Sequence, residues 1–212
     1  MFKKYLMTVV VFASVLLGNA AHAVLLTLEP ATQQAAPGDT VSIELHVSGL
    51  GEGTPPLFVG GFDMDIMFDP AVLSFLGPYT LGAGLGDPLL GEALDLGLGD
   101  LGAGVINIAE LSLLENDSSS CLFCSSPYLQ DLQGVSILLA TLDFRVDVLP
   151  LGSMTLVDIG IIYGLSDGIG APLDYTVRNA QIENVESVPA PPTLALIALG
   201  LLGTGFTRYR AR

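Results

Sequence analysis

The chain has 212 residues, and its length and composition favour one domain with room for a targeting segment at each end. Half of the residues are apolar, and 25 glycines with 13 prolines are typical of an all-β protein with many turns. All 22 acidic residues lie between Glu29 and Glu186, where only Arg145 and Arg178 are basic, so this part carries a net charge of −20. Such a charge excludes nucleic acid as a partner. It favours cations or basic partners, or else serves solubility alone.

Residues 1–23 predict a secretory signal peptide. Lys3 and Lys4 form a basic start, an apolar run follows over Leu6–Leu17, and Ala21-His22-Ala23 is a small-x-small cleavage site. The exported chain is therefore expected to begin at Val24. The alternative is an uncleaved membrane anchor, but the apolar run is shorter than the roughly 20 residues that span a bilayer.

Residues 24–186 are predicted to form a β-sandwich, because apolar and polar residues alternate in three segments. The predicted inward residues are Val41, Ile43, Leu45 and Val47 in the first segment, Phe58, Phe62, Met64, Ile66 and Phe68 in the second, and Leu142, Phe144, Val146 and Val148 in the third. Alternation of this kind buries one face of a sheet and leaves the other in water.

Further strands are predicted at Val24–Leu28, Val105–Leu114, Met154–Tyr163 and Tyr175–Val185. The pattern does not assign an inward face to the last three. Two segments are predicted to contain no strand. Gly77–Gly104 is rich in glycine and leucine and is expected to be a binding or covering loop, with at most a short helix near Leu89–Leu98. Glu115–Pro127 is polar.

Three motifs carry a resemblance to a known family: Pro37–Thr40 leading into Val41–Val47, Gly60–Pro70 followed by Val72-Leu73, and Leu139–Phe144 with Leu151-Gly152 behind it. Together they resemble a cohesin-type domain, a relative of carbohydrate-binding sandwiches. The resemblance covers most of residues 24–186 and implies an all-β, jelly-roll-like sandwich of about nine strands. Cohesins of cellulosomes bind dockerins, but the wider family also occurs in bacteria without cellulosomes, so the resemblance does not identify the partner.

Asp63 and Asp65 are the candidate metal ligands. Side chains on one face of a strand are about 7 Å apart, so the two carboxylates could flank one Ca²⁺. The chain has no Asp-x-Asp-x-Asp-Gly loop, and Ca²⁺ prefers six or more oxygen ligands. The alternative is that both carboxylates simply face water.

Catalysis is not favoured, because after removal of the signal peptide the only histidine is His46, on an outward strand face. Sugar binding is the alternative function, with Tyr79 and Tyr128 as candidate stacking residues. The chain has no tryptophan, and tyrosine often serves the rim of a core instead.

Cys121 and Cys124 are the only cysteines. In an oxidising compartment they are predicted to form a local disulfide. Free thiols and a redox centre are the alternatives. A zinc site would need two more ligands, and nothing nearby supplies them.

The C-terminal segment begins with Val188, Pro189, Ala190 and Pro191, continues with the apolar stretch Leu194–Phe206, and ends with Arg208, Arg210 and Arg212. It resembles a PEP-CTERM sorting signal, although Ala190 stands where that signal usually has Glu. The resemblance implies a Gram-negative host and a sorting tail over 187–212, whose apolar helix anchors the chain transiently in the inner membrane. It also implies removal of the tail by an exosortase-like enzyme. The arginines would hold the end of the tail in the cytoplasm. An ordinary C-terminal anchor is the alternative.

These features predict a non-enzymatic surface or matrix protein of an exopolysaccharide-associated layer. Its partner would be an extracellular polysaccharide or another surface protein, with Ca²⁺ as the one candidate cofactor. A secreted hydrolase would require a pair of carboxylates with perturbed pKa values in a cleft.

Overall fold

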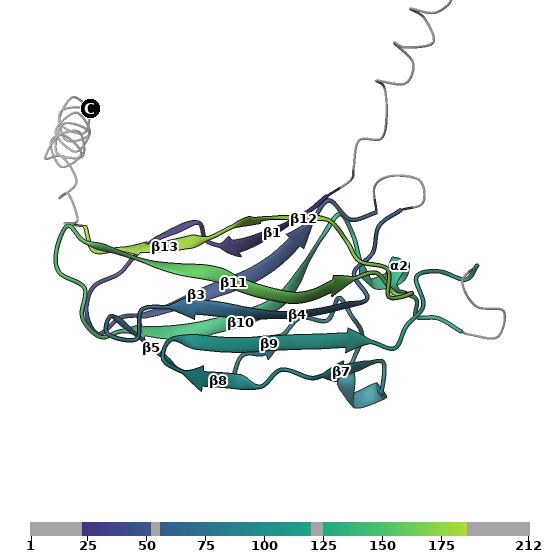
Figure 1. Cartoon of the computed structure of the whole chain (residues 1–212), viewed down its shortest axis with the longest axis horizontal. Coiled ribbons are helices and arrows are strands. Elements are labelled where there is room, and N and C mark those ends of the chain that lie inside the picture. The colour runs from purple at the N-terminus through teal and green to yellow at the C-terminus, as the bar shows by residue number, and fades with distance from the viewer. Residues whose placement is uncertain (1–22, 52–55, 120–124, 186–212) are drawn as a thin grey trace, which may run out of the picture.

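The computed structural model describes residues 23–51, 56–119 and 125–185, which form two sheets packed face to face (Figure 1). Sheet A contains β1 (Val24–Glu29), β3 (Thr40–Ser48), β5 (Leu73–Phe75), β6 (Thr80–Leu81), β10 (Ser136–Val146) and β12 (Tyr175–Arg178). Sheet B contains β2 (Thr32–Gln34), β4 (Gly61–Phe68), β7 (Ala93–Asp95), β8 (Gly99–Gly102), β9 (Val105–Ser112), β11 (Met154–Ser166) and β13 (Ala180–Glu183). The predicted all-β sandwich is confirmed.

The strand order is β12-β1-β3-β10-β5 in sheet A, where β6 also pairs with β10, and β2-β13-β11-β4-β9-β7 in sheet B, where β8 also pairs with β9. Two pairs, β1 with β12 and β2 with β13, are parallel, and the others are antiparallel. The chain changes sheets between β1 and β2 and again between β12 and β13, so the first and last parts of the domain are joined by hydrogen bonds in both layers.

The core lies between the sheets and contains most of the residues that alternation placed there. The side chains of Val41, Ile43, Leu45 and Val47 are all buried, as predicted for the segment that forms β3. Phe144 is fully buried, and its ring lies 5.1 Å from that of Phe68 in sheet B and 5.7 Å from that of Phe75 in sheet A. Stacking and edge contacts of this kind add to the area that aromatic rings bury.

The alternation pattern differs from the structure in the facing of one residue and in the start of one strand. Val148 was predicted to face inward but is 58% exposed, because β10 ends at Val146 and its alternation ends there. Phe58 is buried as predicted, yet β4 begins only at Gly61.

The predicted loop Gly77–Gly104 contains three short strands, β6, β7 and β8, and one 3₁₀ turn, Pro88–Leu90. The prediction that this segment has no strand was therefore wrong. Strands of two to four residues pair with the edges of larger strands, and they are too short to show an alternation of their own. The predicted strand Tyr175–Val185 is likewise two strands, one in each sheet.

The short helix α2 (Leu129–Leu132) follows the polar segment that was predicted to lack strands. Gln133, directly after α2, is buried and holds two distant loops. Its Oε1 accepts a hydrogen bond from the backbone N–H of Val59 at 2.8 Å, and its Nε2 donates to the carbonyl oxygens of Val59 at 2.6 Å and Gly84 at 3.0 Å. Within the described ranges, no helix is long and apolar enough to cross a membrane.

Candidate recognition surface

The outer face of sheet B is the candidate functional surface. Phe62, Met64 and Ile66 of β4 point into the core, so Asp63, Asp65 and Met67 point away from it. In the ladder with β9, Asp63 lies opposite Ala109, Asp65 opposite Asn107 and Gly61 opposite Leu111, which places these partners on the same outer face. In Figure 1, β11, β4 and β9 run side by side across this layer.

Asn107 organises the polar centre of this face. Its Nδ2 donates to Asp63 Oδ1 at 2.9 Å and to Asp65 Oδ1 at 3.1 Å, while its Oδ1 accepts from the backbone N–H of Leu98 at 3.0 Å. The hydroxyl of Tyr163 donates to the other oxygen of Asp65 at 2.9 Å, and this hydrogen bond raises the pKa of Tyr163. Both oxygens of Asp65 are therefore satisfied, although this residue is only 5% exposed.

Large apolar side chains surround this polar centre. Met67, Leu111 and Tyr163 are 41% to 61% exposed. Leu94 of the edge strand β7 is 43% exposed and lies directly opposite Leu111. The β4–β9 ladder places Met67 opposite Val105 and Leu111 opposite Gly61, so the apolar side chains lie toward both ends of this face. Exposed apolar side chains next to polar groups are typical of surfaces that bind other molecules.

A shallow hollow of about 220 Å³ opens on the same face. Gly61, Ala109 and Gly164 leave its floor open, Leu96 and Leu111 line it, and Asp63 adds an acidic side. A Cβ atom on Gly61 would lie 3.1 Å from Leu111 Cδ1, so a larger residue there would crowd the floor. The hollow has the size and chemistry to take one large apolar side chain that has a basic neighbour.

The structure brings the predicted metal ligands Asp63 and Asp65 together, but through the amide of Asn107. Asp65 does not face water, in contrast to the alternative that sequence alternation offered, because Asn107 and Tyr163 cover it. In the part of the chain that the structure describes, no three His, Cys, Asp or Glu side chains gather in a way that could hold a metal. Calcium binding by this pair stays a prediction.

The two candidate sugar-binding tyrosines have different environments. Tyr79 is half-buried, lines a second hollow of about 410 Å³ with Phe75, Pro78 and Asp100, and donates a 2.6 Å hydrogen bond to Asp95. Burial, together with this hydrogen bond, raises its pKa. Tyr128 is only 9% exposed, which leaves its ring no free face for stacking on a sugar.

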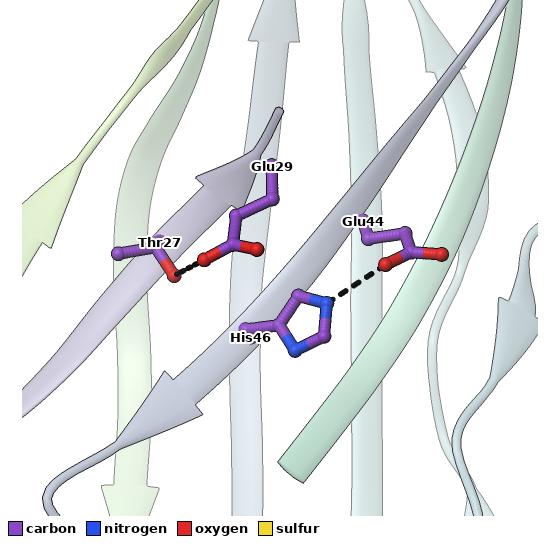
Figure 2. A network of polar contacts seen from close by, with 4 residues as sticks. All are labelled: Thr27, Glu29, Glu44 and His46. Atoms are coloured by element: carbon purple, nitrogen blue, oxygen red, sulfur yellow. Dashed lines mark hydrogen bonds and ion pairs between the residues drawn. The ribbon is translucent and has the colours of Figure 1, made fainter. Parts of the chain in front are cut away.

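His46 lies on the outer face of sheet A (Figure 2). Its Nε2 lies 2.8 Å from Glu44 Oε2, and on the neighbouring strand Thr27 Oγ1 donates to Glu29 Oε1 at 3.3 Å. Glu29 and Glu44 are directly opposite each other in the β1–β3 ladder. The imidazole is thus part of a surface network of carboxylates and a hydroxyl.

Gly164-Leu165-Ser166-Asp167-Gly168 has the Gly-x-Ser-x-Gly spacing of many hydrolases, in which the serine stands on a sharp turn between a strand and a helix. Here Ser166 is the last residue of β11, and a turn follows. In this turn, Asp167 Oδ1 accepts hydrogen bonds from the backbone N–H groups of Ile169 and Ala171. His46, the histidine among the described residues, lies on the other sheet, so within that part of the chain no imidazole is placed to act as the base for this serine. The pentapeptide serves as a strand end.

Several predicted sites lie outside the described residues. They are the cysteine pair Cys121 and Cys124, the sorting motif Val188, Pro189, Ala190 and Pro191, the basic tail Arg208, Arg210 and Arg212, and the signal peptide. The disulfide and the sorting signal stay predictions.

Sequence reasoning missed Asn107 and Tyr163 as parts of the surface, because the inward face of their two strands could not be assigned. Glu110 is the third residue that sequence reasoning missed. It stands two residues after Ile108 and four after Ile106, and this spacing indicates that its side chain faces inward with theirs.

No protein-family model and no curated protein sequence matches the chain, but solved structures do. The sixth cohesin of scaffoldin B from Acetivibrio cellulolyticus, solved with a dockerin, is 19% identical at a TM-score of 0.55, and the match covers 77% of this chain and 99% of that one. The seventh ScaB type I cohesin from Pseudobacteroides cellulosolvens is 12% identical at a TM-score of 0.56, over 80% and 96%. A type I cohesin–dockerin complex from Clostridium thermocellum matches at 11% identity and a TM-score of 0.53, over 77% and 99%. The domain therefore has the fold of cohesins.

Proposed function

We propose that this protein is a non-enzymatic adhesion or scaffolding module that binds a partner protein through the outer face of sheet B. The partner would present apolar side chains flanked by Lys or Arg. The observation that carries the proposal is the hollow lined by Leu96 and Leu111 with Asp63 beside it, on a domain whose net charge is −20. Complementary charge speeds encounter and selects partners, while a buried apolar anchor supplies most of the affinity.

The cohesin fold supports a protein partner, since two of the similar cohesins are solved with dockerins. At 11% to 19% identity, that support concerns the kind of partner and not its identity. A dockerin-like module is one partner that would suit the surface.

The test compares two exposed apolar residues on different faces. Leu111→Asp places a charge beside the hollow, whereas Val177→Asp places one on β12 in sheet A, at nearly the same exposure (41% and 43%). Proteins from the native host that bind the wild-type domain should bind Leu111→Asp at least tenfold less and Val177→Asp equally well. The opposite pattern would place recognition on another face.

Carbohydrate binding is the second candidate function. The hollow beside Tyr79 favours it, because Phe75 and Pro78 add apolar surface and Asp100 adds a hydrogen-bond acceptor. Titration calorimetry with exopolysaccharide from the host should then show binding that Tyr79→Ala abolishes. Binding that survives this substitution would exclude the site.

Export and sorting complete the proposal. The signal peptide over 1–23 and the tail over 187–212 would deliver the domain to the cell surface or matrix, with an exosortase-like enzyme removing the tail. The mass of the protein from its host should lack both segments. An intact C-terminus in the membrane fraction would instead indicate an ordinary anchor.

A further inference from the structure

Glu110 is a buried acid without a hydrogen-bond partner. It lies on β9 and is 1% exposed, and neither oxygen of its carboxyl group has a hydrogen-bond partner in the described structure. Its position opposite Phe62 in the β4–β9 ladder places its side chain on the inner side of sheet B. Burying a carboxylate without a donor or a cation costs several kcal/mol or more, so such a group is expected to be neutral.

The groups around Glu110 make its ionisation still less favourable. Asp95 of the edge strand β7 lies directly opposite it, and Tyr79, which precedes β6 in sheet A, donates its hydroxyl to Asp95. From β4 the neighbour is the uncharged Phe62. Arg145 of β10 does not offer a positive charge to Glu110. It forms an ion pair with Asp147, just past the end of its own strand, and points away from the core.

The segment after β7 closes over this cluster. Asp95 Oδ1 accepts from the backbone N–H of Gly97 at 3.1 Å as well as from Tyr79. A Cβ on Gly97 would lie 2.2 Å from the Tyr79 hydroxyl oxygen, so only glycine lets the segment pack this closely. The backbone N–H of Leu96 then donates to the carbonyl of Ala109 at 3.0 Å. The Asp95–Tyr79 bond thereby connects an edge of sheet B to sheet A.

We propose that Glu110 is a pH-dependent latch for the edge strand β7. With a neutral Glu110 carboxyl group, β7 and the segment through Gly97 lie closed against β9. When Glu110 ionises beside Asp95, the negative charge must reach water, and the simplest route is opening of this edge. A bound metal ion is a poorer alternative, because Asp95 and Glu110 supply only two carboxylates where Ca²⁺ prefers six or more ligands.

The pH range follows from the burial and from the Asp95 charge, which raise the pKa of Glu110 from 4.5 to about 7. The closed edge binds a proton more tightly than the open edge. The equilibrium constant for opening therefore rises with pH, by up to about tenfold per pH unit between pH 4.5 and about 7. Above about pH 7 it is constant. Leu96, which lines the hollow, moves with this edge. The latch itself does not depend on the proposed function, whereas its effect on a partner does.

Hydrogen exchange tests the latch on the intact domain. Two backbone hydrogen bonds join this edge to the β9 side. The amide of Leu96 donates to the carbonyl of Ala109, and the amide of Leu113 donates to the carbonyl of Glu92. After correction for the intrinsic exchange rate, their protection should fall by up to about tenfold per pH unit from pH 5 to 7 and then level off. Amides in the β1–β3 ladder serve as the internal reference and should not change.

Glu110→Gln keeps the shape of the side chain and removes the titration, so protection of the two amides should become independent of pH. Should this variant not fold, Asp95→Asn gives a second test, because removing the facing charge should move the transition to lower pH. Protection that does not vary with pH in the wild type, or that varies equally in Glu110→Gln, would overturn the latch. A partner that binds equally at pH 5 and 8 while the edge opens would refute only the link to recognition.

Discussion

Replacing Asn107 with alanine should destabilise the domain more than removing any other polar side chain on the outer face of sheet B. The substitution removes two hydrogen bonds to carboxylates, one from the backbone N–H of Leu98 and a long 3.5 Å contact with the carbonyl oxygen of Met64. Hydrogen bonds to charged groups contribute about 1.5–3 kcal/mol, and neutral ones about 0.5–1.5 kcal/mol. The bond to Asp63 counts for less because water reaches that side chain, whereas Asp65 is buried. The expected loss in the free energy of unfolding is about 3 kcal/mol.

The assay is urea unfolding of the domain, followed by circular dichroism, with the slope checked for two-state behaviour. Asn184→Ala is the matched control, because Asn184 donates one neutral hydrogen bond, to the carbonyl of Leu149 at 2.6 Å. It should cost about 1 kcal/mol. Equal losses for the two variants would show that the contacts of Asn107 with the two carboxylates contribute nothing to stability.

Three further outcomes are expected. Gln133→Ala removes three hydrogen bonds to buried backbone groups and should cost about 3–5 kcal/mol in urea unfolding, whereas Gln130→Ala, exposed on α2, should cost under about 0.5 kcal/mol. Gly60→Ala should abolish or severely weaken folding, because its Cβ would lie 2.4 Å from backbone atoms, while Gly134→Ala meets nothing within 4 Å and should be tolerated in thermal melts. Glu110→Gln should stabilise the domain at pH 8 by about 2–3 kcal/mol and not at pH 4, since the raised pKa makes wild-type stability fall as pH rises from 4.5 to about 7. Equal stabilisation at both pH values would contradict that assignment.

The buried faces of the long strands could be predicted from sequence, because a period of two is a local property. Val41 to Val47 and Phe62 to Ile66 lie where their alternation placed them. The short edge strands β6, β7 and β8 could not be predicted, because each depends on pairing with a longer strand. β6 pairs with the distant β10, and β7 and β8 pair with β9. The two glycines of β8 and the Ala and Asp of β7 also have little strand propensity of their own.

The candidate surface was only half visible in the sequence. Alternation placed Asp63 and Asp65 on the outer face but could not show that side chains from two other strands cover Asp65. Residues on neighbouring strands meet only through the register of the sheet, which depends on the whole fold. The same limit applies to Glu110, whose partner strand lies in a segment predicted to be a loop.

Site-specific photo-crosslinking in the native host identifies which face of the domain contacts a partner protein. A photoreactive amino acid would replace Leu111 on the outer face of sheet B and, in a second strain, Val177 on sheet A. Recognition by the outer face of sheet B should give a discrete crosslinked protein from position 111 that is absent at position 177. The contact segment of that protein should combine apolar residues with Lys or Arg. Crosslinks that form only at position 177, or none at either position, would contradict recognition of a protein by this face.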